Sequence, residues 1–298
     1  MPAPFTKLIA AIKMANYQRL RKRREPQRIA YQQWVAEHDV MTDQKRAELQ
    51  AQYDALDNKP LISIIMPVYN AHLGWLDEAI ESIRNQIYQE WELCIADDCS
   101  TDPSIRPYLE TKMQQDNRIK VEFRPSNGHI SAASNTAISA ASGEFLALMD
   151  QDDLIPEYAL LTVVECINQH PDAGLIYSDE DKTDEHGNRE APTQKGPWQP
   201  SLLTTHNRLS HLSTYRASLV REIGGFRLGY EGAQDHDLAL RCTDRLSHRQ
   251  ILYIPKVLYH WRIHDQSTAM DKSTKPYAEV ARKKTLRDYV TNRHTSPK

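Results

Sequence analysis

The spacing of apolar residues changes near residue 60 and divides the chain into two parts. Before that point, two stretches have the 3.6-residue period of helices, one over residues 4–24 that ends near Pro26 and a charge-mixed one from about 28 to 57. After it, residues 61–66 form a short β-branched run that Pro67 ends, which predicts a buried strand. We therefore expect a basic, amphipathic helical extension over residues 1–58 and one larger domain over 59–298, which includes a C-terminal helix.

Strands and helices alternate through the first half of the larger domain. Further strands are predicted at 91–96, 119–123 and 145–149, with helices at 73–86, 105–115, 130–141 and 154–168. Strands separated by helices of this length form βαβ units, so the fold class is α/β, with a mostly parallel central sheet flanked by helices. Ligands bind such sheets at the carboxyl ends of the strands, so the polar residues after each strand are the first candidates for a site.

The segment from 178 to 210 has a different character from the alternating region before it. It is polar and contains several Pro and Gly residues. We expect a long loop over the site, serving as a lid for an acceptor.

Charge is unevenly distributed along the chain. Residues 1–28 carry eight Lys and Arg side chains against Glu25, a net charge of +7, and the remaining 270 residues carry −10. An acidic body argues against nucleic acid as a partner. The basic, apolar-striped first segment predicts either a helix on an anionic membrane surface or a helix packed on the larger domain or on a partner subunit.

The sequence also bears on location. The four cysteines show no CxxC spacing, which favours free thiols in a reducing compartment. The first apolar stretch precedes the basic cluster, opposite to the order in a signal peptide, and no apolar run approaches the roughly 20 residues that span a bilayer. We expect a cytoplasmic protein, attached at most peripherally at the inner leaflet of the cell membrane.

The clearest chemical signal is an acidic cluster after the fourth predicted strand. Asp150, Asp152 and Asp153 place three carboxylates within four residues, and they need a cation or protons to coexist. Hard oxygen ligands of this kind suit Mg²⁺ or Mn²⁺, which typically complete their coordination with substrate phosphates. The alternative is an acidic turn that caps the next helix.

Several motifs in a fixed order resemble the family 2 glycosyltransferases of the GT-A (Rossmann-like) fold. These are Pro67-Val68-Tyr69-Asn70, Asp97 to Asp102, Asp150 to Asp153, and Gln234-Asp235-His236-Asp237-Leu238. The match extends through Asn127 to Asn135, Ser178 to Lys182, Gly224 to Arg227 and Leu258 to His264. This longer pattern is similar to a bacterial subgroup associated with O-antigen, capsule and other surface polysaccharides, and it covers about residues 60–285.

The resemblance implies an inverting glycosyltransferase that moves a sugar from a nucleotide-diphosphate donor, UDP- or dTDP-linked, to a free or lipid-linked saccharide acceptor. It implies a divalent cation, Mn²⁺ or Mg²⁺, held by Asp152 and His264. Donor-binding residues implied by the resemblance are Pro67, Tyr69, Asn70, Asp98, Asn127, Asn135, Asp150, Gln151 and Arg262. Several of these, among them Tyr69, Asn70 and Asp98, could equally be ordinary turn or capping residues.

The family pattern assigns the general base to Asp235, with Asp237 in support. Residues 232–242 read as the start of a helix, where positions i and i+2 point to different faces, so only one of the two carboxylates easily faces an acceptor. Gln234 stands where many relatives have Glu, which removes one negative charge beside the base. Further acceptor-side candidates are Asp179, Glu180, Asp181, Trp198 and Asp237.

Two other functions remain open at this point. The chain could be a catalytically idle module that binds a nucleotide sugar, or a metal-dependent nucleotidyltransferase or phosphohydrolase that uses the acidic cluster. A Walker-type phosphate loop is missing from the sequence, which excludes the common ATPase explanation.

Overall fold

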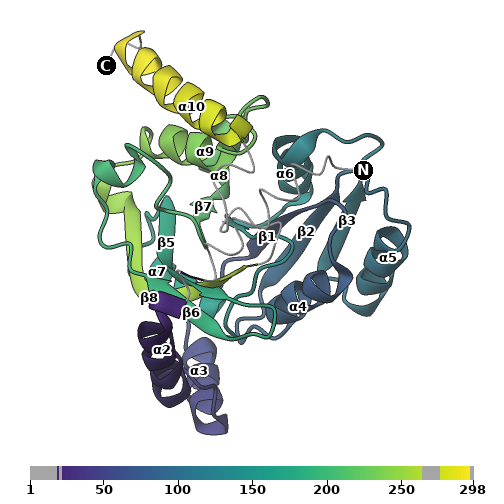
Figure 1. Cartoon of the computed structure of the whole chain (residues 1–298), viewed down its shortest axis with the longest axis vertical. Coiled ribbons are helices and arrows are strands. Elements are labelled where there is room, and N and C mark those ends of the chain that lie inside the picture. Colours follow the sequence, from purple (N-terminus) through teal and green to yellow (C-terminus); the bar gives the residue numbers. More distant parts are fainter. Residues whose placement is uncertain (1–18, 20–21, 264–275, 296–298) are drawn as a thin grey trace.

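The computed structural model describes residue 19, residues 22–263 and residues 276–295. In Figure 1 the sheet lies centrally, the α2–α3 pair projects at one end and α10 at the other. The strands are β1 (Ile62–Val68), β2 (Trp91–Asp97), β3 (Ile119–Phe123), β4 (Phe145–Leu148), β5 (Leu175–Thr183), β6 (Arg189–Thr193), β7 (Thr214–Arg216) and β8 (Ile251–Arg262). The helices are α2 (Glu25–His38), α3 (Asp43–Asp54), α4 (Leu73–Arg84), α5 (Ile105–Gln115), α6 (His129–Ala140), α7 (Ala159–Gln169), α8 (Ala217–Glu222), α9 (Gln234–Thr243) and α10 (Pro276–Thr295), with short 3-10 turns η1 (Pro200–Leu203) and η2 (His248–Gln250).

The sheet order explains where the candidate site forms. The order is β3-β2-β1-β4-β7-β5-β6, with β8 paired to β5. Strands β1 to β4 pair in parallel, whereas β7 runs antiparallel between β4 and β5. The predicted α/β class with a mostly parallel sheet is confirmed, and the carboxyl ends of β1, β2 and β4 meet at one edge.

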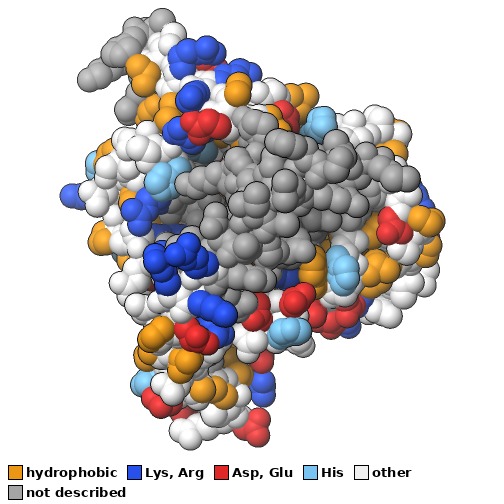
Figure 2. Space-filling view, viewed as in Figure 1, with side chains coloured by type: hydrophobic (Ala, Val, Ile, Leu, Met, Phe, Trp, Pro, Cys, Tyr) orange, Lys and Arg blue, Asp and Glu red, His pale blue; other side chains and the backbone are white. Residues whose placement is uncertain are grey.

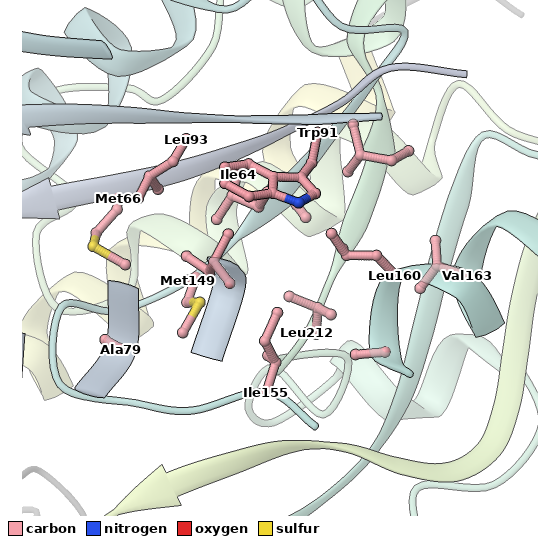
Figure 3. Close-up of a cluster of buried hydrophobic side chains, with 14 of the residues drawn as sticks. Ile64, Met66, Ala79, Trp91, Leu93, Met149, Ile155, Leu160, Val163 and Leu212 are labelled. Carbon is pink, nitrogen blue, oxygen red and sulfur yellow. The ribbon is translucent and has the colours of Figure 1, made fainter. Parts of the chain in front are cut away.

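Alternation along β1 and β2 divides their side chains between two cores. Ile64 and Met66 face a core with α4 and α7, while Ile65 faces a second core with α6 and α9. Figure 3 shows the first of these, with Leu93 near Met66 and with Leu160 and Val163 of α7 at the other side of the cluster. Because successive strand side chains point to opposite faces, continuous apolar runs are needed where both faces are covered.

The prediction of a loop over 178–210 is wrong at its start. Residues 175–183 form β5, which pairs with β6 as an antiparallel hairpin and with β8 in parallel. The acidic residues of this strand are buried, but their carboxylates find partners inside the fold. A polar sequence can therefore occupy an inner strand when each charge is compensated.

The amino-terminal residues that the structure describes are helical, as predicted, but Asp39 to Thr42 interrupt the helix. Thr42 begins α3 by accepting a hydrogen bond from the backbone N of Lys45 at 3.1 Å. Met41 and Tyr53 pack against the first core, so the pair of helices contacts the main body. Most of the helix predicted over 4–24 lies outside the described residues. No helix among the residues described is both long and apolar enough to cross a bilayer.

Candidate active site

The loops after β1 and β2 interlock through Asn70. Its side-chain Oδ1 accepts hydrogen bonds from the backbone N of Thr101 at 2.8 Å and of Asp102 at 3.0 Å. Its own backbone has a φ of 46°, a left-handed conformation that Asn adopts more readily than most residues. Tyr69, beside it, is 45% exposed. Asn70 therefore shapes this edge and leaves the Tyr69 ring accessible to a ligand.

Asp98 is buried at the same edge and forms an ion pair. Its Oδ1 accepts from Arg124 Nε at 2.7 Å and from the backbone N of Gly128 at 3.0 Å. Asn127 donates to the Asp98 carbonyl oxygen at 3.1 Å. The structure thus brings Asp98 and Asn127 together, and both carry the loop that leads into α6.

The acidic loop after β4 is held from two sides. Gln151 accepts from the backbone N of Tyr69 at 2.9 Å, which ties this loop to the end of β1. Asp153 accepts from Tyr259 Oη at 2.6 Å and from the backbone N of Arg262 at 2.7 Å, which ties it to β8. The loop position is therefore fixed by both neighbouring elements.

The same loop concentrates negative charge. Burial, and then the charges of Asp152 and Asp150, raise the pKa of Asp153 well above its usual range. Asp150 and Asp152 are half-buried, and their oxygen donors are of the kind that Mn²⁺ or Mg²⁺ binds. Across the described parts of the chain, no three His, Cys, Asp or Glu side chains form a complete metal site, so a cation here would need further ligands. His264, the second predicted ligand, lies outside the described residues.

Arg262 is fully buried behind the acidic loop. Its Nε donates to the Asp152 carbonyl oxygen at 2.7 Å, and its guanidinium pairs with Glu78 on α4. Arg262 therefore supports the backbone that carries Asp152.

Asp235 stands at the start of α9, within the second part of the site. Asn207 Nδ2 and Ser210 Oγ both donate to its Oδ2, at 3.1 and 3.2 Å. Among the described residues, no donor pairs with the other carboxylate oxygen, Oδ1. One pocket is lined by Pro67, Asp150 and Asp235, together with Asn207, Ser210 and His211. Donor-side and base candidates, distant in sequence, thus face the same space.

Asn135 and Asp237 make structural contacts near this pocket. Asn135 bonds to both the backbone N and the carbonyl oxygen of Phe226, each at 2.8 Å. The Asp237 carboxylate is buried between Arg227 and Arg241, with 2.8 Å to Arg241 Nε. Asp237 is thus paired within the fold, and its role in support of the base stays a prediction.

The remaining acceptor-side candidates point inward from β5 or pack near it. Asp179 accepts from Tyr253 Oη at 2.7 Å, and Asp181 pairs with Arg189 Nε and His260 Nδ1, each at 2.6 Å. Trp198 packs against the second core and meets the His248 ring edge-on. These side chains are not brought into the pocket that Asp235 lines.

Sequence reasoning missed His211. His211 precedes β7 and lines the same pocket as Asp150, which follows β4. Burial lowers the pKa of His211, but the hydrogen bond and charge of Glu180 and the charges of Asp150 and Asp153 outweigh it and raise the pKa to about 9. Only the folded structure reveals this neighbour, because no sequence motif marks it.

Comparison with known proteins identifies the family. The sequence model of glycosyl transferase family 2 matches residues 63–224. The chain is 50% identical over 235 residues to the uncharacterized protein y4gI of Sinorhizobium fredii, covering 79% of this chain and 26% of that protein. It is 32% identical over 247 residues to the O-antigen biosynthesis protein RfbC of Myxococcus xanthus, covering 81% of this chain and 19% of that protein. The chain belongs to glycosyl transferase family 2, and it spans about a fifth to a quarter of the length of these relatives.

Solved structures share the fold. TarS residues 1–349 of S. aureus, in complex with UDP-GlcNAc, match with a TM-score of 0.60 at 19% identity, over 77% of this chain and 71% of that one. The mannosyltransferase PcManGT of Pyrobaculum calidifontis, in complex with GDP-Man and Mn²⁺, matches with a TM-score of 0.57 at 18% identity, over 85% and 71%. The predicted GT-A fold is thereby confirmed.

Proposed function

We propose that this protein is an inverting glycosyltransferase that moves a sugar from a nucleotide-diphosphate donor, UDP- or dTDP-linked, to a saccharide acceptor in the synthesis of O-antigen, capsule or another surface polysaccharide. The observation that carries the proposal is the shared pocket of Asp150 and Asp235. The naming of RfbC as an O-antigen biosynthesis protein supports the product class, and the nucleotide-sugar complexes of TarS and PcManGT support the donor class.

Asp235 acts as the general base in this proposal. Asn207 and Ser210 hold Oδ2, so Oδ1 is the oxygen that takes the proton of the acceptor hydroxyl. The hydroxyl oxygen then attacks the anomeric carbon on the face opposite the diphosphate, and the carbon–oxygen bond to the diphosphate breaks. A single displacement of this kind inverts the anomeric centre.

The donor side is assigned to the edge formed by β1, β2 and β4. Tyr69 offers an exposed ring for the nucleotide base, and the loops held by Asn70, Asp98 and Asn127 give this edge its shape. Pro67, Gln151 and Asn135 complete the donor-binding set, with Arg262 behind the acidic loop. Asp152, with Asp150 beside it and with His264 as the ligand implied by the sequence, would hold Mn²⁺ or Mg²⁺. A cation bound there would compensate the charge of the leaving diphosphate.

The Asp235→Asn variant tests the proposal. An amide cannot accept the hydroxyl proton, so turnover should fall about 10²–10⁴-fold. Donor affinity should stay near that of the wild type, because the donor-side residues are unchanged. Turnover with a panel of UDP- and dTDP-sugars, measured alongside donor affinity, shows whether Asp235 acts as the base. Near-normal turnover would remove Asp235 as the base, and a monophosphate product in place of the intact nucleoside diphosphate would favour a nucleotidyltransferase or phosphohydrolase.

A membrane-bound acceptor fits the basic segment at the amino terminus. Residues 1–28 carry a net charge of +7, and polybasic segments are attracted to anionic leaflets. We assign these residues to peripheral binding at the inner leaflet, with a lipid-linked saccharide as acceptor.

A further inference from the structure

A buried cluster of charges lies behind the loop that carries Asn207 and Ser210. Glu180 of β5 accepts two hydrogen bonds from His211 through one oxygen, Oε2, at 2.6 Å from the backbone N and 3.1 Å from Nδ1. Lys195 Nζ lies 3.1 Å from the same oxygen and also donates to the carbonyl oxygen of His211. The backbone of His211 is thus held at both its N–H and its carbonyl group.

His211 is also fixed through its ring. The imidazole stacks on the Tyr259 ring, with centroids 4.8 Å apart and planes 17° from parallel. Tyr259 in turn bonds to Asp153 in the acidic loop. A single residue therefore receives contacts from β5, β8 and the segment after β6.

The residue before His211 touches the base. Ser210 Oγ donates to Asp235 Oδ2, and Asn207, three residues earlier, donates to the same oxygen. Asn207 also accepts from the backbone N of Leu209 at 3.0 Å, which closes a local turn over residues 207–209, next to Ser210 and His211. Ser210 directly precedes His211, so the position of His211 bears on the donors to Asp235.

We propose that Glu180 is a positioning residue for the general base: it anchors His211, and through residues 207–211 it sets the orientation of the Asp235 carboxylate. The inference rests on the proposed function, because it takes Asp235 as the base. It differs from an acceptor-contact role for Glu180, since the Glu180 carboxylate is turned toward Lys195 and His211.

The Glu180→Gln variant tests this role, because a positioning residue should affect kcat more than donor affinity. Loss of the carboxylate charge loosens the anchor of His211, and kcat should fall about 10- to 100-fold, the size of loss that a misplacement of about an ångström can cause. Donor affinity should change much less than kcat, because Glu180 reaches the donor-side acidic loop only indirectly, through His211 and Tyr259. Unchanged kcat, or a loss that falls wholly on donor affinity, would overturn the proposal.

Glu92 offers a matched control. It is a buried glutamate paired with a lysine, Lys120, and its pKa, like that of Glu180, is lowered to about 2 by its hydrogen-bonding partners against the effect of burial. It lies at the amino end of β2, at the edge opposite the site. Glu92→Gln should lower thermal stability while leaving kcat near that of the wild type. An equal fall in kcat for both variants would assign the effect to lost stability and overturn the positioning role.

A double-mutant cycle completes the test. Ser210→Ala combined with Asn207→Ala removes the two donors, should lower kcat with donor affinity retained, and does not depend on the folding of the Glu180 variant. Adding Glu180→Gln to this background should cost little more, because both changes act through the same turn. No loss from the two alanines, or independent losses that multiply, would overturn the mechanism. The role of Asp235 as general base is tested separately, by the turnover of Asp235→Asn alone.

Discussion

Neighbouring carboxylates of the acidic loop have different surroundings. Asp153 is buried and bonded to β8, whereas Asp152 is half-buried and joins the loop to Arg262 through its carbonyl oxygen. The first holds the loop in place, and the side chain of the second remains the proposed cation ligand. Spacing in the sequence could not assign these roles, because the assignment depends on contacts with β8, about a hundred residues later.

Asp152 leads to a prediction about metal dependence. Asp152→Ala should reduce transfer by about 10²–10³-fold, since charge compensation at the leaving group is lost. EDTA should do the same to the wild-type protein, and added Mn²⁺ should restore activity. Thermal shifts with Mn²⁺ and a UDP-sugar provide a second measurement, and the shift caused by Mn²⁺ should disappear in the variant. Full activity of the wild type in EDTA would contradict the cation role.

His211 leads to a prediction about pH. Its pKa is raised from 6.5 to about 9 in the folded protein, against the effect of burial, by the hydrogen bond and charge of Glu180. The imidazolium therefore contributes stability that is fully present below about pH 6.5 and is lost as the pH rises through about 9, an amount of roughly 1–3 kcal/mol. His211→Gln should flatten the fall in the free energy of unfolding between these two pH values. Urea unfolding of the wild type and the variant at several pH values measures this free energy. Parallel pH profiles for the wild type and the variant would refute the raised pKa of His211.

At the scale of elements, the sequence predicted the βαβ part closely. Strands β1 to β4 and helices α4 to α6 lie within a few residues of their expected bounds, because their apolar periodicity reports burial on one or two faces. The β5–β6 hairpin was missed for the opposite reason. Its buried residues include Asp179, Glu180 and Asp181. Because these residues are acidic, the sequence of β5 lacks the apolar run that predicts an inner strand.

The link between α6 and the Gly224–Phe226 turn also has a measurable consequence. Asn135 satisfies both backbone groups of Phe226, and Gly225, at a φ of 68°, lies so close that an added Cβ would be 2.5 Å from Asn135 Oδ1. Asn135→Ala leaves these backbone groups unpaired and should cost about 1–3 kcal/mol of unfolding free energy. Because Phe226 lines the pocket, transfer should fall as well.

Asn168 provides the control for that experiment. It makes the same kind of paired contact, with the backbone N of Asn58 at 3.0 Å and its carbonyl oxygen at 2.8 Å, away from the pocket. Asn168→Ala should lower stability in urea unfolding without a matching loss of transfer. Equal effects of the two variants on transfer would show that Asn135 acts only through stability.

At the scale of the whole molecule, the helical pair at the amino terminus is bound to the main body by charges. Arg189 pairs with both Asp39 and Asp181 at 2.6 Å, and Tyr31 donates to Asp181 at 2.8 Å. Hydrophobic side chains nevertheless remain at the surface of this region, with Trp34 47% and Ile29 44% exposed. Figure 2 shows hydrophobic and charged side chains intermixed where α2 and α3 project.

Deletion of residues 1–28 tests the membrane role. The change removes the eight Lys and Arg residues of this segment, with their net charge of +7, but keeps Tyr31 and Asp39, so the packing of the helical pair should persist. Sedimentation with anionic liposomes should fall by about tenfold or more, since each basic residue near the surface contributes about 1 kcal/mol to binding. Transfer to a soluble acceptor should be unchanged. Equal liposome binding by the two proteins would show that these residues do not bind the membrane.

The anchoring of α2 at Tyr31 and Asp39 has a geometric consequence. The 14 residues of α2 extend about 21 Å as a helix. The contacts of Tyr31 with Asp181 and of Asp39 with Arg189 fix the orientation of this helix relative to the main body. A membrane contact made by residues 22–28 would then hold the pocket at one height and one tilt above the lipid surface. On vesicles, such a protein would therefore prefer lipid-linked acceptors whose sugar end reaches that height. In detergent, shorter and longer acceptors would react equally well.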